Sequence, residues 1–340
     1  MAEVAKCRPG SMLPVMRVLS RRSLGLIPAA FLVPFVPEVA AQDFDAWLAA
    51  FRSDARKAGI SEKTLKAALD GIRPVDRVIE LDRKQPEGRM TFAEYRGKVV
   101  SDARIERGRR LLAEHAGELA QVRERFGVPP EVVVALWGIE SNFGDFKGRF
   151  QVVDALATLA WEGRRAKFFR RELLAALRIL DDGDVTPAHM YGSWAGAMGQ
   201  CQFMPTTFLH YAVDATGDGR RDIWDSLPDV FASIANYLVE AGWVVGQRWG
   251  REVELPGDGT RLHKGLDHKA PLQRWSEVGV RMADGEPLPE GSMYASLVEV
   301  DGGRGPSFLV YQNFRTIMVW NRSTYFALSV GLLSDLLRES

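Results

Sequence analysis

Apolar residues recur at helical spacing along most of the chain, and this period is the dominant signal in the sequence. Ser101 has a side chain that can cap the N-terminus of a helix, and Gly242 is typical of a helix end because glycine has no side chain. Helices are predicted where apolar positions return every three or four residues: 43–58, 62–69, 101–126, 130–140, 165–180, 227–242 and 324–337.

The helical period is lost from about Arg251 to Met318. Glycines and prolines are frequent there, and the short apolar runs "YASLVEV" and "PSFLVY" are typical of strands. The sequence therefore predicts an α+β protein that is predominantly α-helical, with a small β-rich insert.

The first 41 residues have the pattern of an export signal. Arg21 and Arg22 precede an apolar run, and small residues follow up to Ala41. The paired arginines resemble a twin-arginine leader, although the general secretory route fits the same order. The run is short for a membrane span and contains prolines. With Cys7 too early for a lipid-attachment box, we expect a soluble periplasmic protein after removal of the signal.

The composition argues against a nucleic-acid partner and against a disulfide framework. The 340 residues carry 44 Lys and Arg against 44 Asp and Glu, so the basic excess typical of a nucleic-acid binder is lacking. Cys201 would stand alone once Cys7 is removed with the signal, which leaves no intrachain disulfide framework. We expect a monomer that binds no nucleic acid and needs no organic cofactor.

The stretch "GIESNFG" places one carboxylate, Glu140, directly after an apolar helical run. A carboxylate in such surroundings is costly unless it is paired, protonated or used in catalysis. The chain has no HExxH motif, no glycine-rich phosphate loop and no GxSxG elbow, and its five histidines lack metal-ligand spacing. These absences favour carboxylate chemistry.

The segment "DATGDGRRDIWD", residues 214–225, has the register of an EF-hand calcium loop. Gly219 stands at the sixth position, where the sharp turn requires glycine. Asp225 departs from the pattern, because a longer glutamate usually provides two oxygens at the twelfth position. We expect a single structural Ca²⁺, with Mg²⁺ as the alternative, held by Asp214, Thr216, Asp218, the carbonyl of Arg220, Asp222 and Asp225.

The glutamate segment, the calcium loop and the stretch "YGSWAGAMGQCQFMPTTF" together resemble the lytic murein transglycosylases of the B type. The similarity extends through "TLAWEGRRAKFFRREL" and "QNFRTIMVWNRSTYFALSVGLL". It implies a lysozyme-like catalytic core. The expected organisation is an export signal at 1–41, an N-terminal helical region at 42–126, the core at 127–248, the β-rich insert at 249–318 and a C-terminal helix at 319–340.

The resemblance implies that Glu140 is the catalytic acid and base. It would protonate the oxygen that links N-acetylmuramic acid (MurNAc) to N-acetylglucosamine (GlcNAc), and then activate the muramyl 6-hydroxyl to give a 1,6-anhydro sugar. Leu136, Trp137 and Ile139 can exclude water from the carboxyl and raise its pKa. The implied partner is the peptidoglycan glycan strand, with unidentified cell-wall proteins as further candidates.

The resemblance also implies a set of substrate contacts. Hydroxyl and amide groups would bind sugar substituents, and guanidinium groups would suit the carboxylates of lactyl and peptide groups. The implied positions are Tyr95, Arg164, Arg165, Phe168, Ser193, Gln202, Trp320, Asn321 and Phe326. Relatives often carry tyrosine at three of them, namely Phe168, Trp320 and Phe326. Trp194 or Trp320 could also stack beneath a sugar ring.

Two alternatives to a lytic transglycosylase remain open from the sequence. A second carboxylate able to hold water in the groove would favour a hydrolase of the lysozyme kind. A noncatalytic glycan-binding scaffold would instead keep Glu140 as a structural residue.

Overall fold

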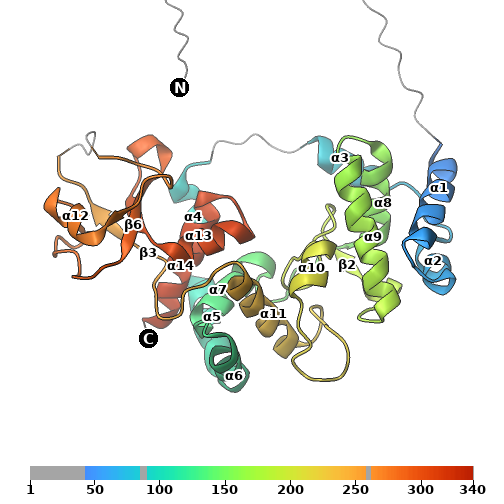
Figure 1. The fold of residues 1–340 in the computed structure, drawn as a ribbon, viewed down its shortest axis with the longest axis horizontal. Helices are drawn as coiled ribbons and strands as arrows, with labels where there is room; N and C mark the ends of the chain where they lie inside the picture. Colours follow the sequence, from blue (N-terminus) through green and yellow to red (C-terminus); the bar gives the residue numbers. More distant parts are fainter. Residues whose placement is uncertain (1–42, 85–89, 258–261, 340) are drawn as a thin grey trace, which may run out of the picture. The chain divides into compact units, whose positions relative to one another are not determined.

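The computed structural model describes residues 43–84, 90–257 and 262–339 (Figure 1). The predicted export signal at 1–41 lies outside these residues. The described residues fall in one compact unit. Within them, no helix is both long and apolar enough to cross a membrane.

The N-terminal region is helical, as predicted. Its helices are α1 (Phe44–Lys57), α2 (Glu62–Leu69), α3 (Asp76–Arg83), α4 (Phe92–Val99), α5 (Asp102–Glu114) and α6 (Ala116–Phe126). The single helix expected over 101–126 is wrong, since the chain breaks at His115. Its ring packs against Trp137 and Phe231 there, and the apolar period runs through the break without marking it. Ser101 caps α5 by accepting from the backbone N–H of Arg104.

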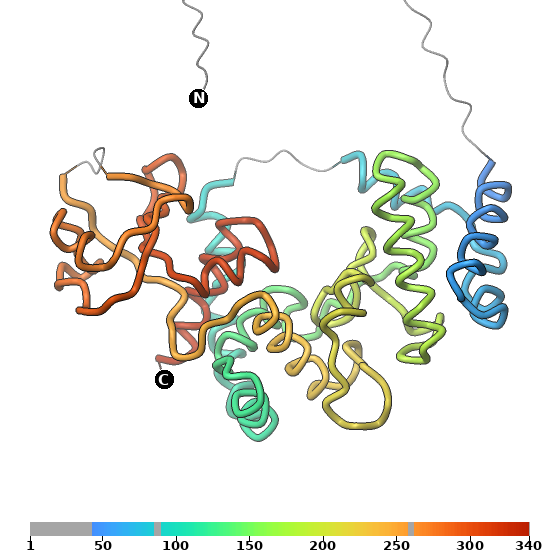
Figure 2. The backbone as a smooth tube through the Cα atoms, viewed as in Figure 1, coloured from blue at the N-terminus to red at the C-terminus, as the bar shows by residue number. Residues whose placement is uncertain are grey.

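The central region is a second group of helices. They are α7 (Pro130–Ser141), α8 (Val152–Glu162), α9 (Ala166–Asp182), α10 (Pro205–Tyr211) and α11 (Leu227–Glu240). Two short strands, β1 (Phe150–Gln151) and β2 (Tyr191–Gly192), pair between them. Helices α8 and α9 pack side by side, in the light-green part of Figure 2.

Helix α7 is buried along most of its length. Pro130 stands at its first turn, where a missing backbone N–H costs nothing, and the side chains from Val132 to Trp137 are all buried. It packs against α5, α11 and α14 (Thr324–Arg338). This packing fixes the end of α7 and therefore the position of Glu140, which is partly buried.

The β-rich insert forms a five-stranded antiparallel sheet in the order β4-β6-β7-β3-β5. Its elements are β3 (Gly250–Glu254), β4 (Ala270–Pro271), α12 (Leu272–Glu277), β5 (Arg281–Met282), β6 (Tyr294–Glu299) and β7 (Ser307–Val310). A small core of its own surrounds Leu272, Trp275 and Tyr311. The insert ends earlier than predicted, because α13 (Gln312–Trp320) already begins inside the segment assigned to it. A helix at the C-terminus is confirmed by α14.

Candidate active site

Glu140 lies in the last turn of α7, where its carboxyl group meets the end of α13. The indole N–H of Trp320 donates a hydrogen bond of 2.7 Å to Glu140 Oε1. Burial raises the pKa of Glu140 from its ordinary 4.5 to about 7, and the bond from Trp320 acts in the opposite direction. The carboxyl is therefore poised to hold and release a proton near neutral pH.

Trp320 is held in place by an aromatic cluster. Its ring lies 4.6 Å from that of Tyr237 and 5.2 Å from that of Phe203, measured between centroids. Tyr237 also donates to the carbonyl of Val319, the residue before Trp320. The sequence suggested Trp320 as a platform for sugar stacking, whereas the structure gives its N–H a direct contact with the catalytic candidate.

The turn after Glu140 is strained and tightly tied. Asn142 and Phe143 adopt left-handed backbone conformations, with φ of 52° and 58°. Ser141 Oγ donates to the carbonyl of Trp137 and accepts from the N–H of Gly144. A side chain at Gly144 would meet Gln200 Oε1 at 2.3 Å, so glycine is required there. The small residues of "GIESNFG" thus close the helix around Glu140.

Gln200 is a residue that the sequence analysis missed. It is 5% exposed, accepts from Trp137 Nε1 at 2.8 Å and donates to the carbonyl of Trp224 at 2.8 Å. It therefore joins helix α7 to the end of the predicted calcium loop. Only its place in the stretch "GAMGQCQF" points to it, and the resemblance implies Gln202 instead. Gln202 has φ of 51° and donates to the carbonyl of Gly199 at 2.8 Å.

Tyr95 comes to Glu140 from a third element, α4. Burial raises the pKa of Tyr95, and the nearby charge of Glu140 raises it further. Its ring lies 5.9 Å from that of Tyr325 at the start of α14. Tyr325 in turn donates to the carboxylate of Asp301, which belongs to the β-rich insert. Residues from α4, α7, α13 and α14 therefore converge on this site.

The remaining predicted contacts differ in how much surface they offer. Ser193 Oγ accepts from the N–H of Ala197, and Asn321 Oδ1 accepts from the N–H of Ser323. Phe168 is 37% exposed on α9. Phe326 is 4% exposed in the core, so its predicted substrate contact has no open surface in this structure.

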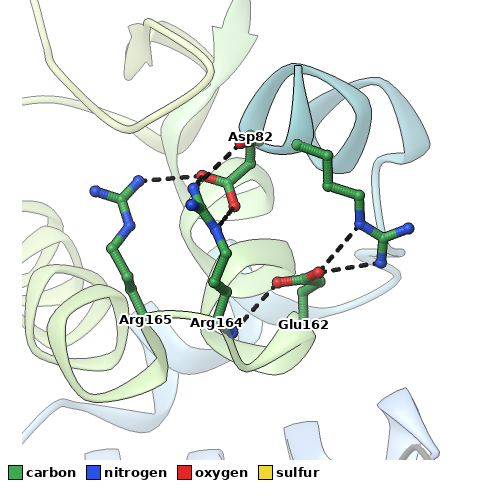
Figure 3. Close-up of polar contacts among 5 residues, drawn as sticks. Asp82, Glu162, Arg164 and Arg165 are labelled. Carbon is green, nitrogen blue, oxygen red and sulfur yellow. Dashed lines mark hydrogen bonds and ion pairs between the residues drawn. The ribbon is translucent and has the colours of Figure 1, made fainter. Parts of the chain in front are cut away.

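Arg164 and Arg165 meet a buried carboxylate that the sequence analysis did not pair with them (Figure 3). Asp82, at the end of α3, is 2% exposed. Arg164 donates to both of its oxygens, and Arg165 donates to Oδ1 at 3.0 Å. The guanidinium groups hold the pKa of Asp82 below its usual value, against the effect of burial. These arginines are therefore not free cations on a solvated helix.

The predicted calcium loop has the expected turn. Asp214 accepts from the N–H of Gly217 at 2.6 Å and from that of Gly219 at 2.8 Å, and Gly219 has φ of 87°. Asp225, at the twelfth position, pairs instead with Lys147 Nζ at 2.6 Å. In the ranges that the structure describes, no three His, Cys, Asp or Glu side chains form a metal-ligand group. The oxygen donors suit Ca²⁺, but they do not converge here.

Comparison with known proteins gives the family of the chain. Residues 43–335 match the transglycosylase SLT domain. The membrane-bound lytic murein transglycosylase B of Escherichia coli strain K12 is 32% identical over 290 residues, which cover 82% of this chain and 79% of the relative. The match to the SLT domain includes Glu140 and the elements around it.

Solved structures agree with this result. SltB3 of Pseudomonas aeruginosa, in complex with NAG-anhNAM-pentapeptide, is 46% identical with a TM-score of 0.85; the match covers 88% of this chain and 80% of that one. The E. coli lytic transglycosylase Slt35, in complex with calcium, is 31% identical with a TM-score of 0.73, covering 86% and 92%. The chain therefore belongs to the SLT-domain transglycosylases, and it is a lytic murein transglycosylase that acts on peptidoglycan.

Proposed function

We propose that Glu140 acts first as an acid and then as a base in cleavage of the β-1,4 bond between MurNAc and GlcNAc. As an acid it protonates the glycosidic oxygen while the substrate acetamido group stabilises the anomeric carbon. As a base it then takes the proton of the muramyl 6-hydroxyl, which closes the 1,6-anhydro ring. The proton thus returns to Glu140, and no water is consumed.

The observation that carries this mechanism is the pKa of Glu140, raised to about 7 by burial with one neutral donor, Trp320, at the carboxyl. Among the described residues, no second carboxylate is a cause of this shift. A hydrolase with two carboxylates would place the second one about 5–9 Å from the first. The environment of Glu140 therefore favours the mechanism that needs only one.

The products released from purified peptidoglycan test the mechanism. The exported form, after removal of residues 1–41, should release anhydromuropeptides, which mass spectrometry identifies. Glu140→Gln should release on the order of a thousandfold fewer. Glu131→Gln is a matched control, because Glu131 lies in the first turn of the same helix and pairs with Arg338 at its surface. Products heavier by one water would indicate hydrolysis instead, and binding without cleavage would indicate a scaffold.

The substrate contacts that we propose lie around this carboxyl and on α9. Tyr95 and Trp320 flank Glu140, and Phe168 offers a partly exposed ring. Ser193, Gln202 and Asn321 would bind sugar substituents through groups that the local turns now hold in place. Phe326 would act only by packing.

We propose that residues 214–225 hold a structural Ca²⁺. The turn at Asp214 and Gly219, together with the calcium complex of a relative, supports this proposal. Binding would require Asp225 to leave Lys147 or to share its carboxylate with it. Chelator should lower the melting temperature and added Ca²⁺ should restore it. Asp214→Asn should abolish that response, whereas Asp284→Asn, in an exposed turn of the insert, should not. An unchanged melting temperature with chelator would rule the site out.

We also propose that the chain is exported to the periplasm and acts there as a monomer. The pattern of residues 1–41 and the peptidoglycan substrate support this location. Cell fractionation with and without residues 1–41 tests whether the chain is exported, because the truncated chain should remain in the cytoplasm.

A further inference from the structure

The two arginines next to Asp82 are bound to it in different ways (Figure 3). Arg164 uses Nε and Nη2 for both oxygens of Asp82, at 2.7 and 2.5 Å, and Nη2 also donates to the backbone carbonyl of Asp82 at 3.1 Å. Arg165 makes one bond, from Nη2 to Oδ1 at 3.0 Å. The Nε and Nη2 donors of Arg164 are thus both hydrogen-bonded to Asp82, whereas Arg165 is held by a single bond from Nη2.

Arg165 keeps donors that can reach a ligand. Its side chain is 44% exposed, and its guanidinium lies 4.8 Å from the centroid of the Phe169 ring. In the part of the chain that the structure describes, Nε and Nη1 of Arg165 have no hydrogen-bond partner. A guanidinium that has free N–H donors and packs over an aromatic ring is well placed to bind a carboxylate.

Asp82 explains how two neighbouring guanidinium groups stay together. Like charges this close repel each other, and the attraction of both to a carboxylate between them offsets that repulsion. Asp82 is 2% exposed and takes bonds from both, so it neutralises one of the two charges and leaves one at the surface. Glu162 lies next to these residues. It accepts hydrogen bonds from Arg83 and from the backbone N–H of Arg164, and among the described residues it has none from Arg165.

We propose that Asp82 is a positioning residue for substrate specificity. It holds Arg165 ready for a carboxylate on the peptide substituent of the glycan, while Arg164 serves as a structural clamp. The inference rests on the proposed function of the site. It assigns the two arginines different tasks, and it makes α3, far from Glu140 in sequence, part of substrate selection.

The test compares two forms of one substrate, namely glycan strands with their peptides and the same strands after an amidase has removed the peptides. The measured quantity is the ratio of kcat/KM for the two forms. The wild type should prefer the peptide-bearing strands. Arg165→Gln should lower the ratio about tenfold, through KM, since one charge-assisted contact is lost. Asp82→Asn should lower it about fivefold, because Arg165 loses its anchor.

Control variants separate positioning from folding. Glu162→Gln removes a neighbouring carboxylate of equal charge, and it should leave the ratio unchanged. Arg165 is partly exposed, so its variant keeps the proposal testable if Asp82→Asn fails to fold. Equal losses on both substrates, or an unchanged ratio in Arg165→Gln, would overturn the inference. A wild type that releases no anhydromuropeptide from either substrate would instead contradict the proposed function.

Discussion

Two carboxyl groups of this enzyme, both shielded from water, have pKa values that shift in opposite directions. Burial dominates at Glu140 and raises its pKa to about 7, because its partner Trp320 is neutral. At Asp82, hydrogen bonds from Arg164 and Arg165 outweigh burial and lower the pKa. Charged partners thus outweigh burial at Asp82, whereas a single neutral donor does not outweigh it at Glu140.

The difference separates a group that exchanges a proton from one that organises charge. Glu140 can change its protonation state near neutral pH, which general acid and base catalysis requires. Asp82 stays ionised and fixes the positions of two cations. The same type of group thus permits proton exchange at one site and holds a fixed charge at the other, and equivalent substitutions at the two sites should have opposite effects.

Glu140→Gln should increase the stability of the protein at pH 8. The folded state favours the proton on Glu140, so its contribution to stability is present below the ordinary pKa of 4.5 and is lost as the pH rises through about 7. At pH 8 the charged carboxylate costs about 3 kcal/mol, which the neutral amide avoids. Urea unfolding at pH 8 and at pH 4.5 measures this, and the gain should vanish at the lower pH. A destabilised variant at pH 8 would contradict a carboxylate that is shielded from water and has no charged partner.

Asp82→Asn should decrease stability at the same pH, by about 2 kcal/mol, because two guanidinium groups lose their common partner. The lowered pKa of Asp82 means that its contribution is present above the ordinary value of 3.8 and is lost as the pH falls through the lower folded value. The deficit should therefore shrink in acid, opposite to the trend for Glu140→Gln. Parallel pH dependence in the two variants would show that the contrast is absent.

The sequence indicated the candidate glutamate better than its surroundings. An apolar helical run before Glu140 was enough to indicate a costly carboxylate, since the apolar run along α7 is a local property of the sequence. Helix positions followed in the same way for α1, α2, α7, α9 and α11. The break at His115 was missed, because it depends on packing against α7 and α11 rather than on the local period.

Partners of the site residues could not be predicted, because they come from distant segments. Asp82 and Arg164 lie 82 positions apart, and Glu140 and Trp320 lie 180 apart. The sequence also cannot tell which of two similar residues makes a given contact. Gln200 and Gln202 are two positions apart, and Gln200 is the one that accepts a hydrogen bond from Trp137. No local pattern distinguishes these alternatives before the chain folds.

Trp320→Phe should produce the smallest of these effects, a shift in the pH dependence of activity. The indole N–H stabilises the charged form of Glu140, so its loss should raise the pKa further and move the alkaline limb of the rate profile upward by up to about one pH unit. Phenylalanine keeps an aromatic ring against Phe203 and Tyr237, which limits changes in packing.

The control for this shift is Trp275→Phe in the β-rich insert, where the lost indole N–H donates to the carbonyl of Ala295, which does not titrate. Its rate profile should keep the position of the wild-type limb even if its stability falls. A limb that moves downward in Trp320→Phe would mean that the indole favours the protonated form of Glu140. The contrast with Asp82 would then weaken, because a neutral donor would no longer oppose the effect of burial at Glu140.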